Sequence, residues 1–183
     1  MKEILLSILL LTTSTFADCT YSSKNSKITW NAFKTYEKIG VSGTFDKTVY
    51  IPKTAQSIDS LLTSSQILIQ TASVNSGNAG RDATLLSSFF KVQNAHTIEA
   101  KIISAKAGKA VVEIFMNNVK KMIPMNYHVE NEKVVAKGTI DLGDFAMLPS
   151  LNAINKACYD LHAGKTWQDV EIGFEIATAK NCY

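Results

Sequence analysis

The chain has few of the residues that metal, redox and hydrolytic chemistry require. Its 183 residues include three cysteines and three histidines. The cysteines form no Cys-x-x-Cys pair, and His96, His128 and His162 lie far apart without a second ligand at metal spacing. The sequence also has no Gly-x-Ser-x-Gly turn, His-Glu-x-x-His pair, phosphate-binding loop or Gly-x-Gly-x-x-Gly. We therefore expect a protein that is not an enzyme and that uses no metal and no cofactor.

An excess of charge of one sign is also missing. The 19 lysine and arginine residues are nearly balanced by 16 aspartate and glutamate residues, so the formal net charge is +3. The basic residues form no stripe interleaved with stacking aromatic side chains. Nucleic acid is therefore not an expected partner.

Long apolar runs are absent, and the chain begins with a short one. Ile4–Leu11 is far shorter than the roughly 20 residues that a membrane-spanning helix needs, so we expect no integral membrane anchor. Lys2 precedes this run, and Thr15 and Ala17 place small residues at the −3 and −1 positions of a cleavage site. We predict a signal peptide at 1–17, cleaved after Ala17, and a periplasmic or secreted protein. Asp18 before Cys19 disfavours a lipoprotein.

Proline and glycine are too scarce to form a linker. The chain has 3 prolines and 9 glycines, and it has no repeat and no block of charge. A length of this order buries enough surface for one stable core. Residues 18–183 are predicted to form a single domain.

The remaining sequence alternates apolar and polar residues with a period of two. Ile98, Ala100 and Ile102, for example, alternate with Glu99 and Lys101. This period is typical of strands with one buried face. Eight such runs occupy residues 27–36, 40–51, 65–76, 96–108, 109–118, 119–131, 133–143 and 168–180.

Short turns around Gly108, Asn117-Asn118 and Asn131 separate several of these runs. Turns of this length join antiparallel neighbours. The expected fold is therefore all-β, an eight-stranded antiparallel barrel with short helical insertions, and a β-sandwich is the competing solution.

Three insertions at residues 54–65, 80–90 and 146–167 are expected to be helix or loop. In the second, Asp82 is the expected N-cap of a helix that ends in Phe89 and Phe90. In the third, Pro149 is a first-turn residue and Gly164 the stop. The apolar stripe expected to face the barrel between them is Leu151, Ile154, Ala157/Cys158 and Leu161.

Three segments carry a resemblance to a known family. The segment "VSGTF" (Val41–Phe45) resembles an early V-x-G-x-F motif, "GRDATLLSSFF" (Gly80–Phe90) resembles an R-D-x-x-L-x-S motif followed by paired phenylalanines, and "GTIDLGDFAM" (Gly138–Met147) resembles a D-F-G-like strand end. Together they resemble the YceI-like family of secreted, lipocalin-like, lipid-binding proteins. The resemblance implies a lipocalin-like barrel around an elongated apolar tunnel that takes a long-chain isoprenoid or similar amphipathic lipid.

The sequence departs from the family pattern at three places. Leu142 stands where the family often has arginine, Ala146 where it often has glycine, and Asn117-Asn118 where a glycine turn is usual. Without a cation at Leu142, the resemblance does not imply an anionic lipid headgroup at that position.

One face of each strand supplies the candidate ligand-binding residues, although each of them is also a candidate for ordinary core packing. The candidates for the tunnel lining are Trp30, Phe45, Ile69, Ile98, Ile102, Phe115, Ile123, Met125, Tyr127, Ile140 and Phe174, with Phe89, Phe90 and Phe145 near a mouth that the helix would seal. Arg81 has two candidate roles: to donate to a polar lipid head, or to tie its loop to backbone carbonyls, and the second is favoured.

Closure of a barrel would bring the first and last strands together in antiparallel sense. We therefore expect Cys19 and Cys182 to be the candidate disulfide and Cys158 to be free, although connectivity cannot be read from sequence and other pairings stay open. If one helix contained both Cys158 and His162, the two side chains could face each other as thiolate and base.

Three function classes follow from these observations. The first is a periplasmic carrier of a long-chain isoprenoid or fatty-acid derivative, with the lipid as ligand. The second is a non-enzymatic interaction or stress-response module with a solid core, for which a homodimer is an option. The third and least favoured is a thiol-dependent enzyme.

Overall fold

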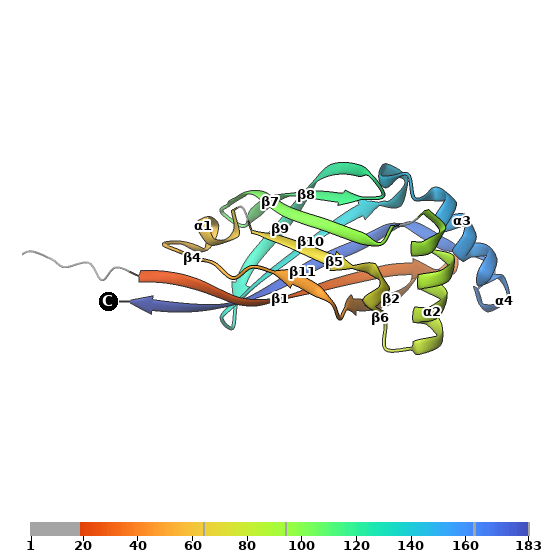
Figure 1. Cartoon of the computed structure of the whole chain (residues 1–183), viewed down its shortest axis with the longest axis horizontal. Helices are drawn as coiled ribbons and strands as arrows, with labels where there is room; N and C mark the ends of the chain where they lie inside the picture. Colours follow the sequence, from red (N-terminus) through yellow and green to blue (C-terminus); the bar gives the residue numbers. More distant parts are fainter. Residues whose placement is uncertain (1–18, 64, 94, 163, 183) are drawn as a thin grey trace, which may run out of the picture.

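The computed structural model describes residues 19–63, 65–93, 95–162 and 164–182. The predicted signal peptide and its cleavage site lie outside these residues. The molecule is elongated, with a curled antiparallel sheet along its long axis (Figure 1). Three helices, α2, α3 and α4, lie at one end, whereas the start of the first strand and the end of the last lie at the other.

The sheet has eleven strands, which is more than the eight that we predicted. The strands are β1 (Cys19–Lys34), β2 (Ile39–Phe45), β3 (Thr48–Tyr50), β4 (Thr54–Ala55), β5 (Gln66–Gln70), β6 (Val74–Asn75), β7 (Thr97–Lys106), β8 (Lys109–Met116), β9 (Val119–Glu130), β10 (Lys133–Asp141) and β11 (Thr166–Cys182). Their order in the sheet is β3-β5-β7-β8-β9-β10-β11-β1-β2-β6. Strand β4 is not part of this order and pairs with β1.

Two interrupted strands account for most of the difference. β2 continues into β3 after Asp46 and Lys47, and β5 continues into β6 through a 3-10 turn, η1 (Thr71–Ser73). The two broken strands pair with each other, β2 with β6 and β3 with β5. Between these pairs, Asp46 N donates to Ser73 O (2.9 Å) and Gln70 N donates to Lys47 O (3.0 Å). The two ends of the curled sheet therefore meet. Counting each broken strand once gives nine strands, and the predicted eight remain when the two-residue strand β4 is also left out.

The three predicted hairpins are present. β7 and β8, β8 and β9, and β9 and β10 are antiparallel neighbours joined by two-residue turns. Asn117 (φ 51°) and Asn118 (φ 60°) both adopt the left-handed conformation that a tight hairpin of this hand needs. Asparagine tolerates that conformation, so it can take the place of the glycine usual at this turn.

The first and last strands form the longest pairing in the sheet. β1 and β11 run antiparallel from Cys19 opposite Cys182 to Lys34 opposite Thr166. The predicted disulfide between Cys19 and Cys182 is confirmed, and Cys158 is free. The bridge joins the two ends of the domain at the tip of this strand pair (Figure 1).

The first insertion is partly strand and was wrongly expected to be only helix or loop. Thr54–Ala55 forms β4 and pairs with Ser22 and Tyr21 of β1. Helix α1 (Ile58–Leu62) follows, with Ser57 as N-cap accepting from Ser60 N.

The second insertion forms α2 (Ala79–Ser88), followed by the 3-10 turn η2 (Phe90–Gln93). The predicted N-cap, Asp82, is wrong, because Asn78 caps the helix by accepting from Arg81 N. Both residue types are good caps, and the helix starts one turn earlier than expected. The carboxylate of Asp82 instead accepts from the backbone N–H and the hydroxyl of Ser76.

The 3-10 turn η3 (Leu142–Phe145) directly precedes the third insertion, which contains two helices, α3 (Leu148–Ala157) and α4 (Tyr159–His162). Its last two residues, Thr166 and Trp167, already belong to β11 and were wrongly expected to be helix or loop. The single helix predicted here is therefore wrong, because it breaks at Cys158. Leu151 and Ile154 are buried as expected, but Leu161 lies beyond the break and is 81% exposed. Gly164, the predicted stop, follows the helical segment and adopts the left-handed conformation (φ 63°).

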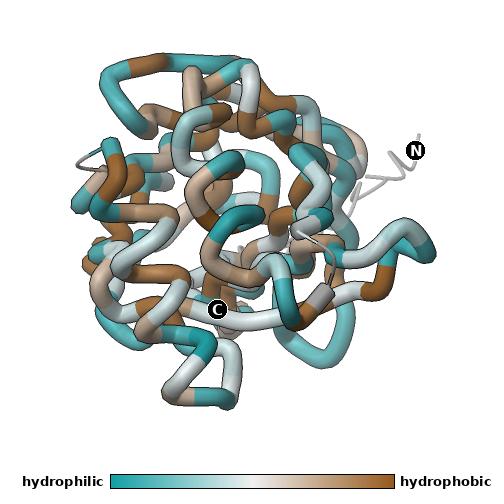
Figure 2. Tube along the Cα trace, turned by 90° about the vertical axis from the view of Figure 1, so that its right-hand side faces the viewer, coloured by the Kyte–Doolittle hydropathy of each residue, from teal (hydrophilic) through white to brown (hydrophobic). Residues whose placement is uncertain are grey.

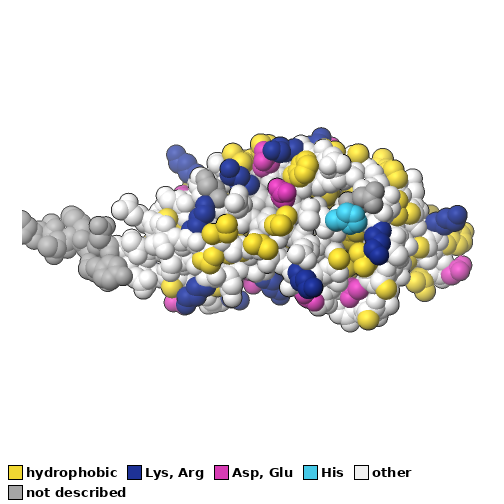
Figure 3. All heavy atoms as spheres, in the orientation of Figure 1, with side chains coloured by type: hydrophobic (Ala, Val, Ile, Leu, Met, Phe, Trp, Pro, Cys, Tyr) yellow, Lys and Arg dark blue, Asp and Glu magenta, His cyan; other side chains and the backbone are white. Residues whose placement is uncertain are grey.

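Hydrophobic and hydrophilic residues alternate along the chain trace in the view from the helix end (Figure 2). The buried side chains form one core cluster inside the curled sheet and beneath α2 and α3. On the face shown in Figure 3, basic and acidic side chains are interspersed rather than gathered by sign. Among the described residues, we find no helix with the length and apolar character to cross a membrane.

Candidate functional site

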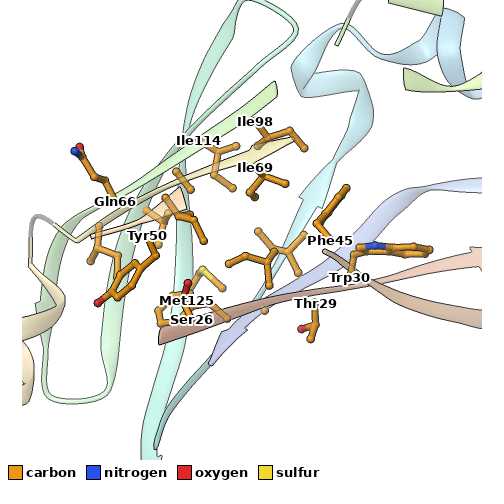
Figure 4. A pocket seen from close by; sticks show the side chains of 18 of the residues that line it. Ser26, Thr29, Trp30, Phe45, Tyr50, Gln66, Ile69, Ile98, Ile114 and Met125 are labelled. Carbon is orange, nitrogen blue, oxygen red and sulfur yellow. The ribbon is translucent and has the colours of Figure 1, made fainter. Parts of the chain in front are cut away.

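The curled sheet encloses an apolar cavity of about 110 Å³, which we call the first chamber (Figure 4). One water needs only roughly 10–15 Å³ by this kind of measure, so the space is several times larger. None of the described residues in its wall is charged. The wall consists of Ser26, Ile28, Thr29, Trp30, Phe45, Tyr50, Ser65, Gln66, Ile67, Ile69, Ile98, Ala100, Ile102, Val112, Ile114, Met116, Met125, Ile140, Ile172, Gly173, Phe174 and Ile176.

A second chamber of about 130 Å³ lies toward the helix end. Its wall adds Leu85 and Phe89 from α2 and its cap, and Leu151 and Ile154 from α3. The residues that the structure describes in this wall are all uncharged. The two chambers share a ring of six side chains: Trp30, Phe45, Ile98, Met116, Ile140 and Ile172. These side chains stand between the two chambers, and we refer to the two adjoining chambers together as the tunnel.

A larger cleft of about 480 Å³ adjoins the second chamber. It shares Trp30, Ala32, Leu85, Ile154 and Thr166 with that chamber. Lys34, Arg81 and the exposed Leu161 also line it, so we call it the outlet cleft. The tunnel thus approaches the surface between β1, α2 and α3, where two cations stand.

Trp30 lines both chambers, and contacts with the neighbouring strand β2 fix its position. Its indole N–H donates to Thr44 O (3.2 Å), and its pairing partner on β2 is Gly43. A Cβ on Gly43 would lie 2.2 Å from Cζ2 of the Trp30 ring and 2.6 Å from Asn75 O. The glycine of "VSGTF" is therefore needed because the tryptophan ring covers its backbone.

Aromatic contacts join the sheet to the helix end. The rings of Phe45 and Phe90 lie edge to face at 6.1 Å, and those of Phe89 and Phe90 at 5.1 Å. Because edge-to-face pairs favour a fixed geometry, this cluster holds the end of α2 against β2. The second chamber is closed on this side by the same side chains.

The opposite end is fastened by a polar contact to α1. The hydroxyl of Tyr127 on β9 donates to Oδ1 of Asp59, whose Oδ2 accepts from Ala107 N (3.3 Å). Desolvation, with a further contribution from the hydrogen bond to Asp59, raises the pKa of Tyr127. Asp59 thus ties α1 to the β7–β8 turn and to β9.

A family model described as YceI-like domain matches residues 20–178. The chain belongs to the YceI-like family. No curated protein matches it.

Solved structures share the fold of this YceI-like domain at low sequence identity. A polyisoprenoid binding domain from Saccharophagus degradans is 12% identical with a TM-score of 0.59, over 92% of this chain and 100% of the other. BcnA from Burkholderia cenocepacia is 15% identical with a TM-score of 0.57, over 84% and 96%. A YCEI protein from Campylobacter jejuni is 16% identical with a TM-score of 0.51, over 100% and 93%.

Most of the residues predicted for the lining of the YceI-like domain stand at the tunnel wall. Those in the wall of the first chamber are Trp30, Phe45, Ile69, Ile98, Ile102, Met125, Ile140 and Phe174. Phe89 and Phe90 line the second chamber. Their contact with a ligand stays a prediction.

Four predicted residues lie elsewhere. Ile123, Tyr127 and Phe145 are buried in the core but line neither chamber. Phe115 lies on the outer face of β8, beside Glu113 and Lys120, so its assignment to the tunnel lining is wrong. Alternation along β8 turns its even-numbered residues inward, and Phe115 shares the outer face with Glu113.

Arg81 has the favoured loop-tying role. Its Nε donates to Ser76 Oγ (2.7 Å) and its Nη2 to Ser76 O (2.8 Å). Asp82 accepts from the same serine, so the Arg-Asp pair clamps the chain just before α2. Arg81 also lines the outlet cleft, where contact with a lipid head stays untested.

The departures from the family pattern have local explanations. Leu142 is buried and lines the second chamber, which keeps that chamber apolar. Asn117 donates from its side chain to Phe145 O (3.0 Å), a link that glycine cannot make. Ala146 adopts φ 54°, the left-handed conformation in which glycine is unstrained.

Cys158 lacks the surroundings of an activated thiol. Burial raises its pKa, and the opposing effect of Lys34 is smaller. Because α3 ends at Ala157 and α4 begins at Tyr159, Cys158 and His162 do not share one helix, contrary to the arrangement considered from sequence. Within the described ranges, no three His, Cys, Asp or Glu side chains gather as a metal site.

Several wall residues were missed because sequence reasoning favoured large side chains. Val112, Ile114 and Met116 line the first chamber, and their alternation with Glu113 could have identified them. The polar wall residues Ser26 and Tyr50 had no comparable signal, because a hydroxyl group does not distinguish an inward from an outward position.

Proposed function

We propose that this YceI-like domain binds one long-chain amphipathic lipid, an isoprenoid or a fatty-acid derivative, and carries it within the periplasm. The observation that carries the proposal is the pair of adjoining chambers, in whose walls every residue that the structure describes is uncharged. Each CH₂ group moved from water into such a space gains about 0.8 kcal/mol. A chain therefore gains affinity in proportion to the length that it buries.

Two further observations support the proposal. The Saccharophagus degradans neighbour with the same fold is named a polyisoprenoid binding domain. The disulfide between Cys19 and Cys182 suits an oxidising compartment, as expected for an exported protein. The domain acts in this proposal as a binding protein rather than as an enzyme.

Native mass spectrometry of a mildly purified mature protein tests the proposal. We expect one long-chain molecule per protein, which organic extraction then identifies. A lipid-free mass that stays unchanged after addition of isoprenoids and fatty acids would support a solid interaction module instead.

Two neighbouring substitutions on β8 provide a matched control. Ile114→Gln places an amide in the wall of the first chamber, whereas Phe115→Gln places the same group on the outer face. We expect Ile114→Gln to lose the ligand and Phe115→Gln to keep it, with circular dichroism confirming that both fold. Equal retention in both variants would contradict a ligand in the first chamber.

A further inference from the structure

Two neighbouring segments at the helix end carry large apolar side chains that point into water. Among the described residues, the three most exposed large apolar side chains are those of Leu161 (81%), Tyr36 (74%) and Tyr159 (68%). Tyr36 is in the turn between β1 and β2, and the other two are in α4. We call these three residues the end patch. Exposed apolar side chains that gather in one place mark a contact surface.

Hydrogen bonds hold the two segments together. In the β1–β2 turn, Thr35 N donates to Lys165 O (2.9 Å), and Thr35 O accepts from the indole N–H of Trp167 (2.8 Å). Lys165 and Trp167 follow directly after α4 and Gly164 in the chain. The turn therefore packs against the segment that leaves α4, at the helix end of the molecule (Figure 1).

The end patch adjoins the place where the tunnel approaches the surface. Leu161 lines the outlet cleft, and Thr166 lines both that cleft and the second chamber. Trp167 also lines the second chamber, and the ammonium groups of Lys165 and Lys38 lie 4.2 and 4.9 Å from its ring. The same short stretch of chain thus supplies part of the patch and part of the chamber wall.

Cations are in a slight majority around the patch. Residues 34–39 and 156–169 contain four lysines and three acidic residues, namely Lys34, Lys38, Lys156, Lys165, Glu37, Asp160 and Asp169. One of the acids is already neutralised, because Asp169 is paired with Lys38 (2.7 Å). Tyrosine, leucine and lysine together are typical of a membrane interface, where the rings lie among the headgroups and the ammonium groups reach phosphate.

We infer that the end patch docks on the surface of a lipid bilayer, so that a lipid passes between the bilayer and the tunnel without crossing water. The inference rests on the proposed function. Each CH₂ group that meets water during transfer lowers the population of that state by roughly fourfold. A carrier whose outlet touches the bilayer avoids this loss.

The size of the patch favours a bilayer over a protein partner. A stable protein–protein interface buries about 800 Å² on each partner. Three side chains offer less than this, because a fully buried aromatic side chain covers only about 150–250 Å². A few inserted side chains are enough for reversible contact with a bilayer.

Vesicle flotation and lipid transfer test the inference. Delipidated protein is floated with vesicles of phosphatidylethanolamine and phosphatidylglycerol. Protein loaded with a pyrene-labelled fatty acid is then mixed with increasing amounts of the same vesicles. The variant Tyr36→Ser/Tyr159→Ser changes the patch but neither chamber nor the outlet cleft. The matched control Val49→Ser/Ile51→Ser removes two exposed apolar side chains from the outer face of the sheet.

We expect wild type to float with the vesicles and to transfer the fatty acid at a rate that rises with vesicle concentration. The patch variant should lose about tenfold in vesicle affinity, because two partly inserted rings remove about as much apolar surface from water as one buried aromatic side chain. Its transfer should slow accordingly, while its affinity for the fatty acid added from solution stays unchanged. The control should match wild type, and circular dichroism checks that both variants fold.

Four results would overturn the inference. Wild type that does not float, or a patch variant that floats as well as wild type, excludes docking through the patch. A transfer rate independent of vesicle concentration shows that the lipid leaves through water, and the proposed function survives. A dimer in sedimentation velocity that the patch variant loses, without vesicle binding, assigns the patch to a second copy. If the fatty acid does not bind from solution, the proposed function fails and the inference fails with it.

Discussion

Ala100→Leu distinguishes an empty chamber from a packed core. Ala100 lies on β7 between Ile98 and Ile102, and all three line the first chamber. Leucine adds three carbon atoms, each of which gains about 0.8 kcal/mol if it leaves water for vacant apolar space. Ordering the longer side chain costs about 0.5–1 kcal/mol. The net expectation is a stabilisation of about 1.5 kcal/mol, or a rise in melting temperature of roughly 3–6 °C.

The same substitution should weaken lipid binding. If the leucine displaces about two CH₂ groups of the ligand, the loss is about 1.6 kcal/mol, roughly tenfold in affinity. Thermal unfolding of delipidated protein and displacement of an apolar probe measure the two effects. Stability and affinity should move in opposite directions, which core packing does not produce.

Ala136→Leu is the matched control. Ala136 is 1% exposed on β10 and lines neither chamber, so the added carbons meet occupied space. Overpacking of this kind costs about 1–3 kcal/mol. If Ala100→Leu destabilises the protein as much as Ala136→Leu does, the first chamber is not vacant and the reasoning is refuted.

Three other regions give separate predictions. Cys19→Ser/Cys182→Ser should lower the free energy of unfolding by about 2–5 kcal/mol in urea titrations, because the bridge closes a loop with a sequence separation of 163; an unchanged midpoint would contradict this. Ala146→Gly should raise stability by about 0.5–1 kcal/mol, since φ is 54° there, and a loss would show that the Ala146 methyl group is needed. The raised pKa of Cys158 should make its alkylation at pH 8 slower in folded protein than in urea, and equal rates would contradict the burial. Because the pKa of Cys158 is higher in the folded than in the unfolded protein, its protonated thiol favours the folded state. This stabilisation is fully present below the unfolded pKa of about 8.5 and is lost as the pH rises through the higher folded pKa.

The strand pattern and the disulfide were predictable because both follow from local periodicity and from closure. Alternating residues identified the strands from β7 to β10, and two-residue turns identified their antiparallel order. Closure then placed Cys19 beside Cys182. The strand breaks at Asp46-Lys47 and at Thr71–Ser73 were not predictable, because the bends depend on hydrogen bonds between segments distant in sequence.

The tunnel wall was predictable only in part. Alternation restricts each strand to two faces, and the inward face was chosen correctly where a charged neighbour marked the outer one, as for Ile98 beside Glu99. For β8 the size of Phe115 was given more weight than its shared face with Glu113, and the choice was wrong. Whether an inward residue lines vacant space or fills the core, as Tyr127 does, depends on packing across the whole sheet.

The vacant tunnel and the disulfide have opposite effects on stability. The chambers have volumes of about 110 and 130 Å³. Vacant space in a core destabilises the folded protein by about 24 cal/mol per Å³, so the two chambers together cost about 6 kcal/mol. In the chain-entropy model, a bridge with a sequence separation of 163 contributes about 5 kcal/mol, which is nearly the same. The bridge joins β1 to β11, and these two strands supply Ile28, Trp30, Ile172 and Phe174 to the wall. Closing the sheet at its ends therefore offsets the space left open in its middle, so the domain can remain folded while the chambers are empty.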